Sequence, residues 1–333
     1  MIKNKVYYAK ANYGNSEISA VIKVLKNQRL NLMNSNNVRL FEKKIAKLFN
    51  KKYGLMVNSC SSANLLALSS LSLKSGSEVI TPSLTFSTTV SPIIQLGLKP
   101  VLVDVTLDSL LIDVKKIERM ITKKTKAMII PNLIGNIPNL DILKNLCKKY
   151  KLFYIEDSAD TIDSYYNKKP TGDYADISTT SFYASHVITC AGFGGMLCTN
   201  NEEIYKKAIV QRGWGRNSSL FEEKESIKLR FKSKNSYDEK YLFTELGYNF
   251  IPSEISAAFG LEQLKKLKKF SKLRNRNFYF LYDFFSKYDD YFLLPKIDQK
   301  VKNIWLAFPF MVRNNKINRN DLQIYLEKNN IQT

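Results

Sequence analysis

Short apolar runs alternate with segments of helical periodicity between residues 53 and 200. Strands joined by crossover helices run parallel, so the alternation predicts an α/β fold with a mostly parallel sheet. The strands are expected at 53–57, 78–81, 101–104, 127–130, 152–155, 177–182 and 196–199, and the helices between them at 61–73, 86–96 and 140–150. Polar loop residues collect where these strands end, which is where open α/β sheets bind ligands.

The pattern changes after residue 200. We expect a helix at 202–212, a charged surface excursion at 217–240, a long helix from the start signals Pro252 and Glu254 to about residue 287, and a strand at 304–312. We divide the chain into a large domain with an N-terminal segment, residues 1–250, and a smaller C-terminal domain, residues 251–333. The sequence contains no internal repeat and no glycine/serine linker, so the two domains should pack together.

The net charge of +21 raises the question of a nucleic-acid partner, because a basic surface supplies most non-specific affinity for phosphate backbones. The positive charge is mostly lysine and is scattered in pairs. Its densest cluster, residues 265–269, falls in an expected amphipathic helix whose other face carries Leu261, Leu264 and Leu267. This distribution is typical of a solvated surface, and we expect no nucleic-acid partner.

Targeting signals and cysteine spacing bear on location. The chain has no apolar run of about eighteen residues and no secretory leader, so we expect a cytoplasmic protein without membrane insertion. Its four cysteines lack CxxC spacing, which predicts reduced thiols and no metal site.

Two segments at expected strand ends carry polar residues. Residues 58–64, Asn-Ser-Cys-Ser-Ser-Ala-Asn, leave a strand and enter a helix, where free backbone amides form an anion pocket. Serines at such a position also serve as plain helix caps. Asp157 follows an apolar strand. Its carboxylate could cap a following helix, or it could face the ring nitrogen of a pyridine cofactor and keep that nitrogen protonated.

The only histidine, His186, lies between an expected buried strand and the glycine-rich residues 191–195. Glycines let the backbone approach a ligand closely, and an imidazole can transfer a proton near neutral pH. The alternative is an ordinary imidazole that makes one hydrogen bond in the core or at the surface.

Several segments in the same order resemble the DegT/DnrJ/EryC1/StrS aminotransferase family, the sugar-nucleotide branch of the fold-type I pyridoxal-phosphate enzymes. The resemblance runs from about Tyr13 to Thr333. It is carried by Phe-Glu at 41–42, Val-Asn-Ser-Cys-Ser-Ser-Ala-Asn at 57–64, Thr-Pro-Ser-Leu-Thr-Phe at 81–86, Gly-Asn-Ile-Pro at 135–138, Glu-Asp-Ser-Ala-Asp at 156–160, Ser-Phe at 181–182 and Gly-Tyr-Asn at 247–249. The resemblance implies a mostly parallel, mixed seven-stranded sheet flanked by helices, with a smaller α+β C-terminal domain.

The resemblance also implies a cofactor, pyridoxal 5'-phosphate or its amine form pyridoxamine 5'-phosphate. By matching position, Asp157 would pair with the pyridine nitrogen, Phe86 would stack on the ring, the backbone amides of Ser61 and Ser62 and the hydroxyl of Ser181 would hold the phosphate, and Asn249 would reach the phosphate of a neighbouring subunit. This last role implies a homodimer with shared sites. For Phe86 the alternative is ordinary core packing.

His186 stands where the family carries the lysine that binds the cofactor covalently, and no lysine occurs between Lys169 and Lys206. Imidazole cannot form that bond but can move a proton. The similar subgroup consists of sugar 3-dehydratases, which implies removal of the C3 hydroxyl from a nucleotide-linked 4-keto-6-deoxyhexose for cell-surface polysaccharide, with L-glutamate as amino donor. A nucleotide-sugar aminotransferase without lysine and a degenerate, non-catalytic family member are the alternatives.

The sequence departs from the family pattern in several places. Cys60 replaces a usual glycine, which would alter the anion pocket if the backbone there had positive φ. Gly192 and Phe193 replace a usual acidic residue. Residues 217–240 contain no cysteine, so the iron–sulfur branch of the dehydratases is not expected. Relatives run past the position of Thr333, so we expect the small domain to be incomplete.

Overall fold

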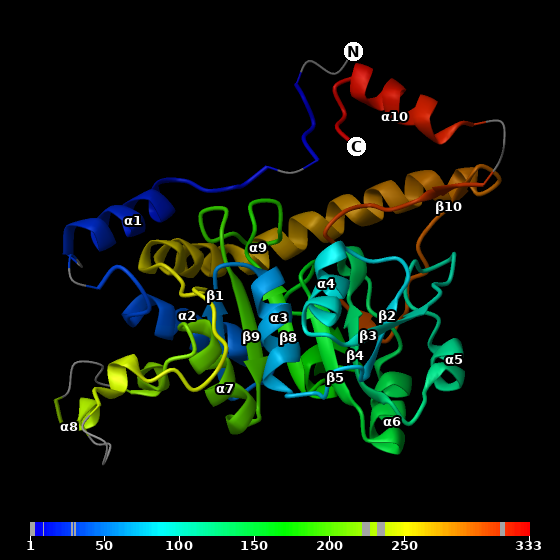
Figure 1. The fold of residues 1–333 in the computed structure, drawn as a ribbon. Helices are drawn as coiled ribbons and strands as arrows, with labels where there is room; N and C mark the ends of the chain where they lie inside the picture. Colours follow the sequence, from blue (N-terminus) through cyan, green and yellow to red (C-terminus); the bar gives the residue numbers. More distant parts are fainter. Residues whose placement is uncertain are drawn as a thin grey trace.

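A seven-stranded sheet forms the centre of the molecule in the computed structural model, which describes residues 4–8, 10–27, 29, 31–221, 227–231, 237–313 and 317–333 (Figure 1). Its strands are β1 (Tyr53–Val57), β2 (Glu78–Pro82), β3 (Lys99–Val103), β4 (Thr125–Pro131), β5 (Phe153–Ser158), β8 (Ile177–Ser181) and β9 (Gly195–Thr199), in the spatial order β1-β9-β8-β5-β4-β2-β3. Strand β9 is antiparallel to β1 and β8, and all other neighbours are parallel. The expected mixed, mostly parallel sheet of seven strands is confirmed.

The helices among the described residues are α1 (Asn15–Asn27), α2 (Asn36–Leu48), α3 (Cys60–Ser70), α4 (Ser87–Gln95), α5 (Val114–Ile117), α6 (Leu140–Tyr150), α7 (Glu202–Arg212), α8 (Ile227–Arg230), α9 (Glu254–Phe285) and α10 (Arg319–Lys328). Helices α3, α4, α6, α7 and α9 lie close to their expected positions, and the other helices had no predicted range. The bounds of α6 and α7 are as predicted. The expected excursion at 217–240 lies partly outside the described residues. None of the described helices is long and apolar enough to cross a membrane.

Alternate side chains of the strands pack against helices on opposite faces of the sheet. Leu55 and Val57 of β1 pack with helices α3 and α7, whereas Met56 between them packs with α2 and α9. A third cluster covers β2, β4 and β5 beneath α6. Both faces of the central strands are therefore buried, which explains their nearly continuous apolar sequences.

The expected strand at 304–312 is wrong. The described strand there is the short β12 (Met311–Val312), which pairs with β10 (Phe292–Leu293). Ile304 and Trp305 are buried without strand pairing, because this segment closes over the loop at 133–135 instead. Asn303 and Leu306 donate to carbonyls of that loop, those of Gly135 and Ile134. The remaining short strands are β6 (Tyr165–Tyr166), β7 (Lys169–Pro170) and β11 (Val301–Lys302), which form a small separate sheet.

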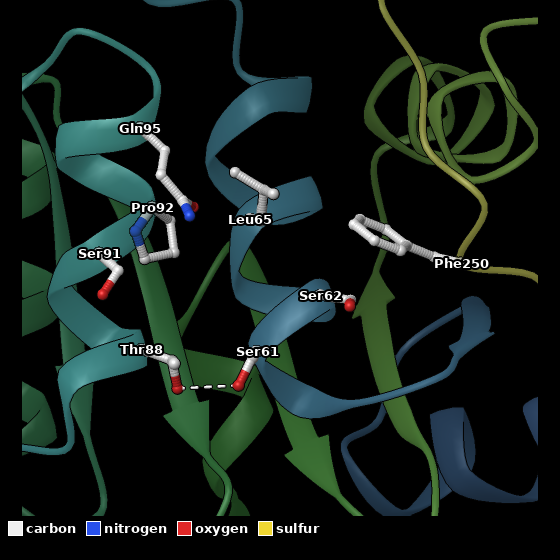
Figure 2. A pocket seen from close by; sticks show the side chains of 8 residues that line it. All are labelled: Ser61, Ser62, Leu65, Thr88, Ser91, Pro92, Gln95 and Phe250. Carbon is white, nitrogen blue, oxygen red and sulfur yellow. Dashed lines mark hydrogen bonds between the residues drawn. The ribbon is translucent and has the colours of Figure 1, made fainter.

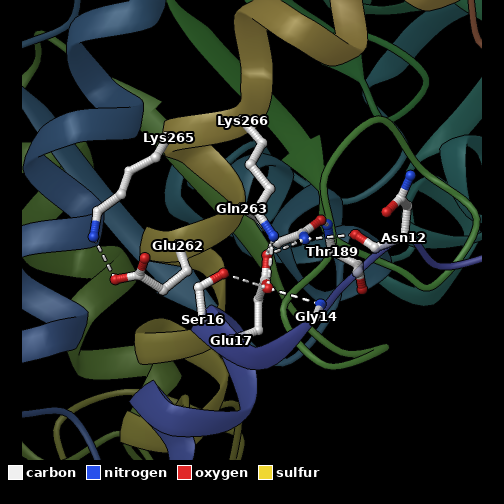
Figure 3. A network of polar contacts seen from close by, with 9 residues as sticks. All are labelled: Asn12, Gly14, Ser16, Glu17, Thr189, Glu262, Gln263, Lys265 and Lys266. Carbon is white, nitrogen blue, oxygen red and sulfur yellow. Dashed lines mark hydrogen bonds and ion pairs between the residues drawn. The ribbon is translucent and has the colours of Figure 1, made fainter.

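A polar network joins the N-terminal helix to helix α9 and to the loop that follows β8 (Figure 3). Glu17 of α1 is fully buried and accepts from Lys266 at 2.5 Å and from Gln263 at 2.7 Å. Gln263 also donates to the carbonyl of Asn12 at 2.8 Å and accepts from the amide of Thr189 at 3.4 Å. Thr189 lies three positions after His186, so the network reaches the segment that carries the histidine.

Candidate functional site

Asp157 is a buried carboxylate inside strand β5, with 3% of its surface exposed. Its Oδ2 accepts hydrogen bonds from Thr89 Oγ1 and Asn64 Nδ2, each at 2.8 Å, and its Oδ1 accepts from the amide of Ala159 at 3.1 Å. Burial raises the pKa of Asp157, and the bonds from Thr89 and Asn64 lower it again. The chain after Asp157 turns and does not enter a helix, so the helix-cap interpretation is wrong.

The partners of Asp157 include side chains that sequence reasoning missed. Asn64 lies on α3, and its amide oxygen accepts from Thr179 of β8 at 2.6 Å. Thr89 lies on α4. Both are buried polar residues on helix faces that meet the sheet. The sequence did contain a signal for these two residues, because each is polar at a position that the helical period assigns to the core.

The first turn of α3 is the segment for which an anion pocket is predicted. Ser59 caps the helix, and its hydroxyl accepts from the amide of Ser62 at 3.1 Å. The side chain of Ser61 donates to Thr88 of α4 at 2.9 Å (Figure 2). Cys60 begins the helix and does not have positive φ, so its backbone fits a side chain. The thiol of Cys60 lies 3.8 Å from Asp157 Oδ1.

Strand β9 brings Ser181 close to this turn. Ser181 of β8 pairs with Gly195 of β9, and its hydroxyl accepts from the amide of Tyr183 at 3.2 Å. A Cβ placed on Gly195 would lie 2.3 Å from the carbonyl carbon of Ser59 and 2.4 Å from the amide of Cys60. Only glycine permits this approach, which sets Ser181 beside the N-terminus of α3.

Phe86 and Asn249 both lie at the surface. Phe86 immediately precedes α4 and is 71% exposed, so the core-packing alternative is wrong. Asn249 is exposed, and no hydrogen bond among the described residues joins its side chain to Ser61, Ser62 or Ser181. The next residue, Phe250, borders an open hollow. The residues that line this hollow are Ser61, Ser62, Leu65, Thr88, Ser91, Pro92, Gln95 and Phe250 (Figure 2). The hollow does not include Asp157 or His186.

His186 lies on the loop between β8 and β9, and only 15% of its side chain is exposed. Its Nδ1 is enclosed without a hydrogen-bond partner among the described residues, and it lies 3.9 Å from Asp160 Oδ1. Burial and the nearby charge of Arg274 lower the pKa of His186 to about 4. The imidazole is therefore neutral at pH 7, and its contact with Asp160 is not an ion pair.

Asp160 connects the histidine to the rest of the site. Its Oδ2 accepts from the amide of Ile134 at 2.7 Å. Burial, opposed by the hydrogen bond from the Ile134 amide and assisted by the nearby charge of Asp157, raises the pKa of Asp160 to about 6. Asp160 thus lies close to His186 and within the electrostatic influence of Asp157, at the carboxyl ends of β5 and β8.

Comparison with known proteins places this arrangement in a family. The chain is 36% identical over 308 residues to the lipopolysaccharide biosynthesis protein RfbH of Salmonella typhimurium, covering 88% of this chain and 70% of that protein. It is 32% identical over 314 residues to GDP-4-keto-6-deoxy-D-mannose 3-dehydratase of Escherichia coli O55:H7, covering 92% and 78%. The solved structure of the E. coli GDP-4-keto-6-deoxy-D-mannose-3-dehydratase with bound hydrated PLP superposes with a TM-score of 0.87 at 30% identity, covering 99% of this chain and 84% of that one.

The fold of the chain is accordingly that of the fold-type I pyridoxal-phosphate enzymes. Residues 12–333 match one family over nearly the whole sequence. The chain belongs to the DegT/DnrJ/EryC1/StrS aminotransferase family.

Proposed function

We propose that this chain is a 3-dehydratase that removes the C3 hydroxyl from a nucleotide-linked 4-keto-6-deoxyhexose. The observation that carries the proposal is the enclosed imidazole of His186 at the position where the family holds its lysine. The similar 3-dehydratase supports this class of sugar, and RfbH supports lipopolysaccharide as its destination. O-antigen as the specific destination stays a prediction.

The residues of the site suit pyridoxal phosphate and pyridoxamine phosphate. A buried carboxylate, Asp157, can face a protonated ring nitrogen. The exposed ring of Phe86 offers a surface for a second ring. The amides of Ser61 and Ser62 and the hydroxyl of Ser181 can hold a phosphate, although the Ser62 amide already has Ser59 as an acceptor.

When bound, pyridoxamine phosphate supplies an amine that condenses with the C4 ketone and a ring that accepts electrons. Asp157 keeps the ring nitrogen protonated through its negative charge. His186 would remove the carbon-bound proton whose electrons expel the C3 hydroxyl, and it would return that proton to the leaving oxygen. L-glutamate would serve as the amino donor that returns the cofactor to its amine form.

The decisive experiment identifies the product. The protein is incubated with pyridoxal phosphate, glutamate and a panel of GDP-, dTDP-, CDP- and UDP-linked 4-keto-6-deoxyhexoses. We expect a 3-deoxy sugar and released ammonia, because the dehydrated enamine hydrolyses after release. The control is His186→Asn, which should retain the cofactor and lose about 10²–10⁴ in rate.

The two alternatives give different results. An aminotransferase would leave nitrogen on the sugar at C3 or C4, and a stable amino sugar would overturn the dehydratase proposal. A degenerate member would develop neither the yellow colour nor the absorbance band on addition of pyridoxal phosphate.

We further propose a homodimer in which Asn249 serves the neighbouring site. The segment before Asn249 exposes many apolar side chains, a feature that marks protein interfaces. They are Trp214, Leu220, Ile227, Phe231, Tyr237, Tyr241, Phe243 and Leu246. The exposed position of Asn249, apart from the serines of its own subunit, supports this role. The domain boundary at 250/251 and the cytoplasmic location stay predictions.

A further inference from the structure

His186 has two ring nitrogens at which a proton can be exchanged, and the choice between them rests on the proposed function of His186. Nδ1 faces Asp160 Oδ1 at 3.9 Å and has no hydrogen-bond partner among the described residues. This separation is about 1 Å longer than a hydrogen bond. Contacts of this kind commonly shorten when a site is loaded.

The chemistry of the two groups decides which ring nitrogen carries hydrogen. An ionised carboxylate has only acceptor atoms, whereas each imidazole nitrogen is either a donor or an acceptor. A carboxylate beside Nδ1 therefore favours the tautomer with hydrogen on Nδ1, which leaves the lone pair on Nε2. We infer that Asp160 is the positioning residue of His186, that it fixes the Nδ1–H tautomer, and that Nε2 is the atom that takes the proton.

The surroundings hold Asp160 in place for this role. Its Oδ2 is occupied by the amide of Ile134, which leaves Oδ1 for the histidine. Ile134 has φ of 56°, a conformation that a β-branched residue rarely adopts. Its carbonyl accepts from the amide of Leu306 at 3.0 Å, and the carbonyl of Leu306 accepts from Arg274 Nη1 at 2.8 Å. These bonds hold the strained loop against Asp160.

Arg274 gives the pair a second charge. Leu306 is the hydrogen-bond partner of its side chain, and no carboxylate pairs with it among the described residues. Its positive charge disfavours protonated His186, whereas the negative charge of Asp160 favours it. The imidazole thus meets opposing charges, which suits a group that must both take and release a proton.

The single histidine makes the tautomer directly measurable. Protein labelled with ¹⁵N-histidine gives long-range ¹H–¹⁵N spectra with the signals of one imidazole. At about pH 8, with pyridoxal phosphate bound, we expect the Nδ1–H tautomer to exceed the other by roughly 10:1, because the 3.9 Å separation should shorten to a hydrogen bond with a charged acceptor when the site is loaded. A wild-type spectrum dominated by the Nε2–H tautomer would overturn the inference, whatever the variants do.

Asp160→Asn tests whether Asp160 is the cause. The amide oxygen is needed by the Ile134 amide, so the –NH₂ group would face Nδ1 and donate to its lone pair. The proton should then move to Nε2, and the tautomer ratio should fall at least tenfold. Asp163→Asn is the matched control, because the Asp163 carboxylate accepts from the Tyr165 hydroxyl. An unchanged ratio in a folded Asp160→Asn would also overturn the inference.

The tautomer and the reaction can fail separately. A wrong tautomer contradicts the positioning role even if the 3-deoxy product forms. Conversely, an absent 3-deoxy product contradicts the proposed function and leaves the tautomer result standing.

Discussion

Thr89 Oγ1 donates a hydrogen bond of 2.8 Å to Asp157 Oδ2, and this bond joins helix α4 to strand β5 at the base of the site. The amide of Thr89 in turn donates to the carbonyl of Phe86 at 3.0 Å. One helical turn therefore carries both the hydroxyl of Thr89, which stabilises the buried carboxylate, and the exposed ring of Phe86. This relation links the two parts of the expected cofactor contact.

Asp157→Asn should reduce turnover by about 10² or more, because an amide has no charge to stabilise a protonated ring nitrogen. In either orientation its –NH₂ group would also face a donor, either the amide of Ala159 or the side chains of Asn64 and Thr89. This clash should lower the free energy of unfolding by about 1–3 kcal/mol. Product formation and urea unfolding measure the two effects. Ser91→Ala, on the exposed side of α4, is the control. Unchanged turnover would make Asp157 purely structural.

Borohydride reduction of the protein with bound pyridoxal phosphate should leave no pyridoxyl group on an active-site lysine, because His186 cannot bind the cofactor covalently. Peptide mass analysis reads this directly. His186→Lys provides the positive control and should acquire the group at position 186. A stoichiometric adduct on an active-site lysine of the unaltered chain contradicts the prediction.

His186 and Asp160 should give opposite dependences of stability on pH. The pKa of His186 falls from 6.5 in the unfolded chain to about 4, so the unfolded chain binds more protons in that window and stability falls as pH falls. The pKa of Asp160 rises from 3.8 to about 6, so its contribution falls as pH rises. The two contributions to the pH dependence of the unfolding free energy nearly cancel between pH 4 and 6.

The single variants should separate these contributions. As pH rises from 4 to 6, the free energy of unfolding of His186→Asn should fall by about 2–3 kcal/mol relative to the parent. That of Asp160→Asn should rise by a similar amount. Urea unfolding at several pH values measures both. If both variants followed the pH dependence of the parent, neither group would have the pKa assigned to it.

Leu246→Lys should weaken the proposed dimer, because Leu246 is 90% exposed within the apolar segment that precedes Asn249. Light scattering after size exclusion should show a dimer for the parent and a larger monomer fraction for the variant. Phe280→Lys alters an exposed side chain on α9 and serves as the control. A monomeric parent with full cofactor affinity would remove the shared-site proposal.

Glu254→Gln should destabilise the fold by about 2–4 kcal/mol. Glu254 is fully buried and accepts from the amides of Ser35, Asn37 and Val38 at 2.6, 2.9 and 3.1 Å, which caps the N-terminus of α2. Glu262→Gln on the same helix removes only a surface pair with Lys265 and should change stability by less than about 0.5 kcal/mol. Thermal and urea unfolding compare the two, and equal losses would contradict the capping role.

The sheet was predictable because its central strands are buried on both faces and have nearly continuous apolar sequences. Leu55, Met56 and Val57 are all apolar although they face different helices. The segment at 304–312 has a similar composition, but Trp305 stacks on Phe278 of α9 and the backbone of Leu306 bonds to the 133–135 loop. Apolar composition indicates that a segment is buried but does not indicate which backbone groups form hydrogen bonds. The strand was therefore predicted wrongly.

Site residues that stand in a sequence motif were predictable. Site residues whose role depends on a tertiary contact were not. His186 and Asp157 stand in recognisable segments. The contact of Asp160 with His186 depends on a strained loop residue, Ile134, which no local pattern announces. Thr89 was missed because its role depends on the distance between α4 and β5, which is set by packing of the whole sheet.

The network of Glu17, Gln263 and Thr189 has a practical consequence for handling the protein. An affinity tag, a protease cut or a deletion near residue 17 would act on a side chain that shares Gln263 with the histidine loop. Preparations that differ only in their first twenty residues could therefore differ in turnover while their spectra and cofactor content agree. Comparisons of specific activity between laboratories should state where each expressed chain begins.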